Sequence, residues 1–130
     1  MNALHAGIVI KSKLLSSKEL NESIHGRIYP IIGVAGTEYP FILYCRTGVS
    51  PDGSKDYVSE QDDTTVVVSI ISDRYEETIE LADLVQSVLQ IGQTSIEGIE
   101  ISEIRLTGFD EEFQDDAFIQ NLIFNIEFEN

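Results

Sequence analysis

Residues 64–92 read TTVVVSIISDRYEETIELADLVQSVLQIG, and this stretch decides the fold because its hydrophobic period changes within it. Thr64–Ser72 is rich in β-branched residues, which favour a pleated, partly buried strand. From Tyr75 onward, apolar residues recur at the spacing of a helix. These residues are Ile79, Leu81, Ala82, Leu84, Val85, Val88 and Leu89. We therefore predict a strand that leads directly into a helix, which supplies both a sheet and a layer that covers it.

Two local signals predict the ends of this helix. Asp73 and Glu76 have the spacing of a capping box, in which the Asp73 carboxylate accepts from the first free backbone N–H groups. Gly92 is placed to end the helix in a left-handed conformation.

The N-terminal residues are predicted to form two helices. Ala3–Leu15 has the pattern of an amphipathic surface helix. Its apolar stripe consists of Leu4, Ile8 and Leu15, and Lys11 and Lys13 lie off that stripe. Ser16 and Glu19 repeat the capping-box spacing, which predicts a short second helix that ends near His25-Gly26.

Four more segments are predicted to be strands, and they are Ile28–Ile31, Pro40–Arg46, Ile96–Thr107 and Ala117–Phe128. Pro30 marks the first as an edge strand or a strand end. In the third, Ile99 and Ile101 have the opposite parity to Ile104 and Leu106. Either a bulge near Ser102-Glu103 brings all four to the core side, or the strand begins only at Ser102.

Ala117–Phe128 has the clearest strand pattern in the chain. Its expected core face consists of Phe118, Leu122, Phe124, Ile126 and Phe128, interrupted by Gln120. Burial of each large apolar side chain contributes about 1.5–3 kcal/mol before the loss of conformational entropy is counted.

The order of these elements predicts an α+β domain with a largely antiparallel, four- to five-stranded sheet and helices packed on one face. The second face of such a sheet is uncovered. Ile119, Ile123, and either Val67 with Ile71 or their neighbours would then be exposed in a monomer. A contiguous apolar patch of this kind indicates an interface.

Two polar segments supply further candidate interface residues. Residues 48–63 form a long polar connection, in which Val49 and Tyr57 could pack the loop down or dock a partner. Phe109–Asp116 is predicted to be an acidic turn, and Phe109 and Phe113 are its candidate partner-binding residues.

The charge of the chain is unevenly distributed. Residues 1–30 contain four basic residues and two glutamates and carry a net charge of +2. Because the whole chain has a net charge of −15, the remaining residues carry −17. Such a field repels nucleic acid and anionic membranes and favours solubility or basic protein partners. Cys45 is the only cysteine, so no intrachain disulfide can form, and it is expected to be a buried structural thiol.

We find no signature of catalysis, cofactor binding or metal binding in the sequence. His5 and His25 lack the spacing of a zinc site, and the acidic run at 110–116 lacks the ligand pattern of an EF-hand. Gly33–Thr37 lacks the lysine of a phosphate loop, and residues 48–53 do not fit a nucleophile elbow. No segment approaches the ~20 apolar residues of a membrane span.

The pattern of the chain resembles the tail-completion, or tail-terminator-like, proteins of long-tailed bacteriophages and prophages. The matching residues are Gly26–Pro30, Tyr39–Tyr44, the strand end at Ser72 with Tyr75, Glu80-Leu81-Ala82, Ile104–Thr107 and Asp115–Gln120. The resemblance runs from about residue 3 to 128 and implies one tail-completion domain over residues 1–130 with a tail-terminator-like fold. Residues 51–63 are the part that fits this family pattern least.

The resemblance implies a non-enzymatic structural role. Such proteins resemble ring-forming subunits, with a hexamer as one possible form, that cap the tail tube and present it to the head connector. The expected partners are further copies of the chain, the tail-tube protein and head-connector or neck proteins, without sequence-specific nucleic acid binding. The expected location is the virion, after assembly in the bacterial host cytoplasm. The alternatives are a small acidic adaptor module of another assembly and a small enzyme with dispersed catalytic residues.

Overall fold

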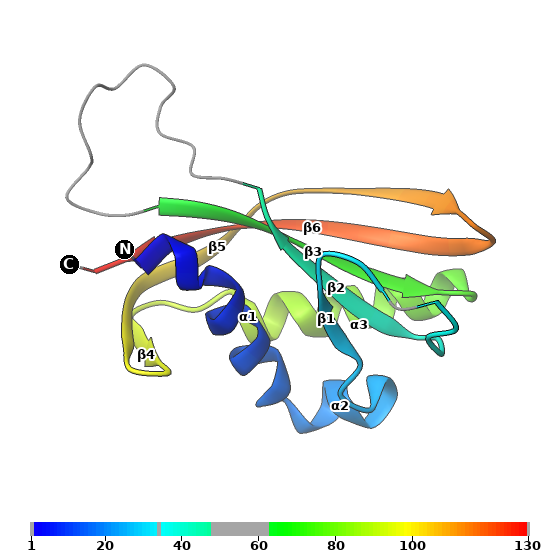
Figure 1. Ribbon diagram of the computed structural model, residues 1–130, viewed down its shortest axis with the longest axis horizontal. Helices are drawn as coiled ribbons and strands as arrows, with labels where there is room; N and C mark the ends of the chain where they lie inside the picture. The colour runs from blue at the N-terminus through cyan, green and yellow to red at the C-terminus, as the bar shows by residue number, and fades with distance from the viewer. Residues whose placement is uncertain (1, 34, 48–62, 130) are drawn as a thin grey trace, which may run out of the picture.

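The computed structural model describes residues 2–33, 35–47 and 63–129, which form an α+β fold (Figure 1). The elements in chain order are the 3-10 helix η1 (Asn2–His5), α1 (Ala6–Leu15), α2 (Lys18–Ile24), β1 (Ile28–Pro30), β2 (Phe41–Arg46), β3 (Asp63–Ser72), α3 (Tyr75–Leu89), β4 (Thr94–Ile96), β5 (Ile99–Gln114) and β6 (Ala117–Phe128).

The described strands form one sheet in the order β1-β2-β3-β6-β5-β4. β1 lies at an edge and runs parallel to β2, whereas the other neighbours are antiparallel, which confirms the largely antiparallel sheet. The prediction of four to five strands was too low, because the described residues form a six-stranded sheet. The unforeseen strand is β4, which pairs with β5 across Glu97-Gly98, where both residues have positive φ.

The helices α1, α2 and α3 lie on the same side of the sheet (Figure 1). The core lies between these layers, and its largest fully buried side chains include Phe124, Phe128, Ile10, Leu14, Ile70 and Leu89. Leu122, Phe124, Ile126 and Phe128 of β6 are buried as predicted, and Phe118 is half-buried. No helix in the described ranges is both long enough and apolar enough to cross a membrane.

The predicted bulge in β5 is present. The pairing with β6 shifts register between Ile101 and Glu103, and as a result both Ile101 and Ile104 are fully buried. Ile99 and Leu106 also pack against the core, so the shift brings all four aliphatic residues to one side. A second shift lies between Leu106 and Gly108.

The predicted apolar stripe of α1 does not face the core. The buried residues of this helix are Ala6, Val9, Ile10 and Leu14. Leu4, Ile8 and Leu15 are instead 62%, 54% and 46% exposed. α1 is apolar on most of its circumference, so the sequence offers two apolar stripes, and the packing of the helix buries only one of them. Half-buried Gly7 allows α1 to lie close to β2, because a Cβ there would lie 3.0 Å from the ring of Tyr44.

The predicted helix ends need correction by one or two residues. α2 is capped by Ser17 and not by Ser16, because the Ser17 hydroxyl accepts from the Leu20 N–H at 3.2 Å. The helix ends at His25, as predicted, and His25 adopts a left-handed conformation there. At the C-terminus of α3, the capping residue is Gln90 in an extended conformation and not Gly92.

The N-terminus of α3 also differs from the predicted capping box of Asp73 and Glu76. Arg74 occupies the N-cap position without a side-chain cap. The Ser72 hydroxyl accepts from the Arg74 N–H at 3.1 Å and donates to Glu77 at 2.6 Å. Ser72 is fully buried at the end of β3, so it holds this junction from inside the fold.

The predicted acidic turn over Phe109–Asp116 is mostly strand. β5 continues to Gln114, which pairs with Ala117, and the turn is only Asp115-Asp116, with φ of 53° and 62°. Phe109 and Phe113 share one parity, but three consecutive carboxylate residues separate them and obscured the strand pattern.

Candidate functional site

Four of the predicted interface residues lie together on the sheet face that carries no helix. Val67 is paired in register with Ile123, and Ile71 with Ile119, on the neighbouring strands β3 and β6. Val67, Ile119 and Ile123 are half-buried, whereas Ile71 is only 6% exposed. The expected exposure is therefore wrong for Ile71, because Ile71 lies between Phe41 and Ile119 as cross-strand neighbours.

A polar network separates the two aliphatic pairs on this open sheet face. The Ser69 hydroxyl donates to Asn121 Oδ1 at 2.6 Å. The Asn121 amide donates to Asp110 at 2.9 Å and to Glu112 at 2.8 Å. The open sheet face is consequently amphipathic, and two carboxylates are fixed on it. This network could have been predicted from the sequence, because Ser69 and Asn121 have the same strand parity as the aliphatic residues of the open sheet face.

Phe109 and Phe113 lie on the opposite face of the β5–β6 hairpin, toward the helices. Phe113 pairs with Phe118, and their ring centroids are 4.9 Å apart. Phe118 in turn makes an edge contact with Tyr75 at the start of α3, at 5.4 Å. Phe109 and Phe113 nevertheless remain 73% and 59% exposed. The structure therefore does not bring these two phenylalanines together with the open sheet face.

Glu111 connects the hairpin to α3. Its carboxylate accepts from the Tyr75 hydroxyl at 2.8 Å and from the Gln120 amide at 2.9 Å. The hydrogen bond from Gln120, followed by that from Tyr75, holds the pKa of Glu111 below its ordinary value. The hydrogen bond between Tyr75 and Glu111 also raises the pKa of the Tyr75 hydroxyl. Gln120 is 9% exposed and also donates to Thr78 at 3.3 Å, which explains the polar residue within the apolar face of β6.

The exposed stripe of α1 borders a shallow groove of about 530 Å³. The groove is lined by Ile8, Lys11, Ser12, Leu15, Ser16, Tyr44 and Glu97. The Ser12 hydroxyl donates to Glu97 at 2.9 Å. Sequence reasoning missed this groove and was wrong to place Lys11 off the stripe, because Lys11 follows Ile8 by three residues and precedes Leu15 by four, and all three line the groove. Helical spacing therefore puts a cation in the middle of the supposed core stripe, where burial is unfavourable.

Two predicted interface residues, Val49 and Tyr57, lie outside the described residues. The described ranges contain no cluster of three or more histidine, cysteine or acidic side chains placed to hold a metal ion. Cys45 is half-buried and not fully buried as predicted, and its sulfur lies 3.5 Å from the carbonyl oxygen of Arg46.

The chain resembles known proteins both in sequence pattern and in fold. A family model described as tail completion protein gp17 matches residues 9–128. Among solved structures, a chain of the virion of a native gene transfer agent particle superposes with a TM-score of 0.78 at 12% identity, covering 95% of this chain and 94% of that chain. A second solved chain, whose name carries no functional description, superposes with a TM-score of 0.64 at 10% identity, covering 99% and 95%. No curated protein matches the sequence.

Proposed function

We propose that this chain, which belongs to the tail completion protein gp17 family, forms a ring at the end of a phage or phage-derived tail. In that position it joins the tail tube to the head connector or neck. The proposed partners are therefore further copies of the chain, the tail-tube protein and a connector protein. The role is structural and involves no catalysis.

The observation that carries this proposal is the family match over residues 9–128, which spans nearly the whole described fold. The resemblance of the fold to a chain of a gene transfer agent virion is consistent with a component of a phage-like particle. A tail-terminator type of fold, a ring and assembly in the host cytoplasm are parts of the proposal.

The surface of the chain supports a role in assembly. The open sheet face has half-buried aliphatic residues around a fixed polar network, and the hairpin exposes Phe109 and Phe113. Interfaces commonly combine aromatic or aliphatic anchors with polar groups that fix orientation. The acidic remainder of the surface is suited to protein partners and repels the phosphates of DNA.

Deletion of the gene from the phage or prophage tests the joining role. We expect DNA-filled heads and separate tails, seen by negative-stain electron microscopy, and restoration of joined particles by the wild-type gene supplied in trans. Joined, infectious particles from the deletion strain would contradict the proposal.

Sedimentation velocity of the purified chain over a wide concentration range tests self-association. We expect a defined oligomer, formed by the chain alone or once tail-tube protein is added. A strict monomer that still binds tail-tube protein would instead support the adaptor role.

A further inference from the structure

We propose that the tip of the β5–β6 hairpin of one copy docks into the α1 groove of a second copy, so that neighbouring subunits contact each other head to tail. The hairpin tip is defined as Phe109–Asp116, and the α1 groove is the one lined by Ile8, Lys11, Leu15 and Tyr44. The inference rests on the proposed self-association and names the two surfaces that meet.

The hairpin tip has the features of an interface anchor. Phe109 and Phe113 are exposed large apolar side chains and lie on one face of the strand. Large aromatic side chains of this kind dominate the binding energy at many interfaces. The tip is also held in place before binding, because Glu111 is fixed by Tyr75 and Gln120, and Phe113 rests against Phe118. Little ordering is therefore needed on contact.

The α1 groove has the complementary features. Ile8 and Leu15 supply exposed apolar surface, and Leu4 extends that surface by one helical turn toward the N-terminus. Tyr44 of β2 forms part of the wall. Lys11 lies between the apolar residues, where its ammonium group can contact an incoming aromatic ring or a carboxylate.

The charges of the two surfaces are opposite. The hairpin tip contains five carboxylates and no basic residue. Asp110 and Glu112 belong to the network on the open sheet face, which leaves Glu111, Asp115 and Asp116 for the contact. Residues 1–30, which include α1, carry a net charge of +2 in a chain of −15, from four basic residues and two glutamates. In the described part of the chain, Lys11, Lys13 and Lys18 form no ion pair. Glu97 is the carboxylate that lines the groove, and it already accepts from Ser12. Glu19 and Glu22 are the two acidic residues of the N-terminal segment. Such complementarity steers encounter and fixes register.

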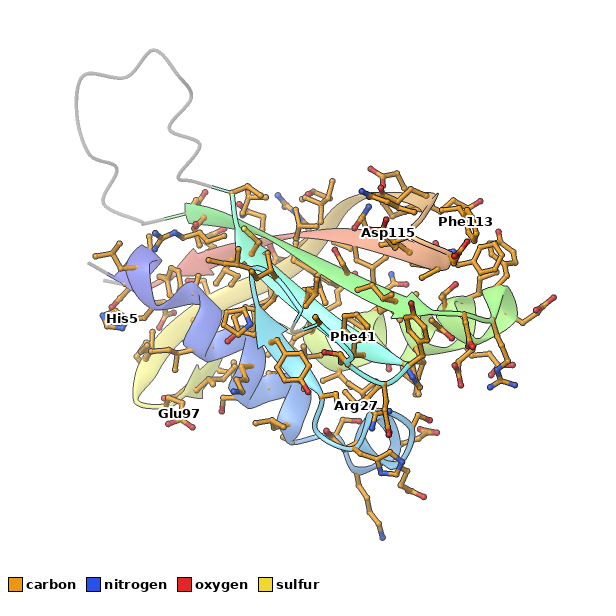
Figure 2. The ribbon with its side chains drawn as sticks, turned by 45° about the vertical axis from the view of Figure 1, so that its right-hand side comes forward. His5, Arg27, Phe41, Glu97, Phe113 and Asp115 are labelled. Atoms are coloured by element: carbon orange, nitrogen blue, oxygen red, sulfur yellow. The ribbon has the colours of Figure 1, made fainter. Side chains whose placement is uncertain are left out.

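The two surfaces cannot meet within one molecule. Glu97 at the groove and Phe113 at the hairpin tip lie at opposite ends of the molecule (Figure 2). A contact between different patches of identical chains is heterologous, and repeated heterologous contacts close into a ring when the rotation between subunits permits it. An apolar, oppositely charged pair of patches at the two ends of one chain therefore provides the geometry that ring assembly needs.

Disulfide trapping tests this contact in the full chain, in a Cys45→Ser background that leaves no native thiol. Variants Ile8→Cys and Phe113→Cys are purified separately, mixed and oxidised. We expect the mixture to give a covalent dimer as the main product, while each variant alone stays mostly uncrosslinked. The double variant should give a ladder of higher oligomers. A matched control mixes Phe113→Cys with Ile32→Cys, which introduces a thiol at another exposed isoleucine, 74% exposed.

The outcome distinguishes the contact from the proposed function. If the wild-type chain forms oligomers in sedimentation but the Ile8→Cys and Phe113→Cys mixture crosslinks no better than the Ile32→Cys control, the contact is overturned and the ring proposal stands. If the chain stays monomeric at all concentrations and with tail-tube protein, the ring proposal itself fails, and the contact fails with it.

Discussion

The carboxylate of Glu77 shows how much a single side chain contributes at the junction of β3 and α3. It accepts from the Ser72 hydroxyl and from the Arg74 guanidinium, both at 2.6 Å. Burial of Glu77 raises its pKa, but the hydrogen bonds from Ser72 and Arg74 and the charge of Arg74 together outweigh burial and lower it. Since the folded-state pKa is depressed, the stabilisation is present above the unfolded pKa and is lost as the pH falls through the folded pKa.

We predict that Glu77→Gln lowers the free energy of unfolding by about 1–2 kcal/mol at pH 7, because two charge-assisted hydrogen bonds are weakened. The difference from wild type should shrink as the pH falls below the ordinary glutamate pKa of about 4.3, since the wild-type residue then becomes neutral as well. Urea denaturation at pH 7 and at a series of acidic pH values measures this. Glu76→Gln on the same helix is the control, and an equal loss at all pH values would contradict the assignment to charge.

A second residue-scale prediction concerns Gln120, which donates to Glu111 inside the hairpin contact. Gln120→Leu should raise the pKa of Glu111, because it removes the hydrogen bond that contributes most to lowering that pKa. Tyr75→Phe removes the next contribution and should raise the pKa by less. Side-chain carboxyl NMR titration reports both values. An unchanged Glu111 pKa in Gln120→Leu would show that the network does not hold the hairpin tip.

At the scale of elements, the strong periodicities of the sequence predicted β3, α3, β6 and the bulge in β5 correctly. Their burial follows from apolar patterns that fit one period and one face. The exposed stripe of α1 could not be chosen in advance, because two apolar stripes compete and only the tertiary packing, against α3 as well as β2, selects one. The hairpin tip was assigned to a turn because its carboxylates suggested solvent exposure, although strand pairing leaves one side of an extended hairpin in solvent. Of the candidate site, the grouping of Val67, Ile71, Ile119 and Ile123 followed from parity, whereas the α1 groove depends on tertiary structure.

The turn of the β5–β6 hairpin gives an element-scale prediction. Asp115 and Asp116 both have positive φ. Two-residue hairpin turns with positive φ at both positions are most favourable with the sequence Asn-Gly. Asp115→Asn combined with Asp116→Gly should therefore raise the free energy of unfolding by about 1 kcal/mol, since glycine adopts positive φ without a steric cost. Chemical denaturation measures the change. The matched control is Gly98→Ala in the β4–β5 turn, at φ of 76°, which should destabilise the fold by a similar amount. A destabilised Asn-Gly variant would contradict this account of the turn.

At the scale of the whole molecule, the open sheet face is a surface separate from the two surfaces of the proposed subunit contact. The proposed head-to-tail contact uses the hairpin tip and the α1 groove. The open sheet face does not take part in it, so its amphipathic surface remains available for the tail-tube or connector protein. The fixed carboxylates of Asp110 and Glu112 on that face favour a partner with basic groups.

Matched lysine substitutions on the two surfaces separate these roles. Phe113→Lys removes an aromatic anchor and puts a cation where Lys11 should be met, so we expect the dissociation constant for self-association to rise at least tenfold, about 1.4 kcal/mol. Ile123→Lys places the same side chain on the half-buried open face, where its alkyl stem can lie along the sheet. Self-association should then stay close to wild type while capture by immobilised tail-tube or connector protein weakens. Sedimentation and surface binding measure the two effects, after thermal melts confirm that both variants fold. In a head-to-tail ring, loss of either half of the subunit contact separates neighbouring subunits. If Ile123→Lys dissociated the oligomer and Phe113→Lys left it intact, the subunit contact would therefore lie on the open sheet face.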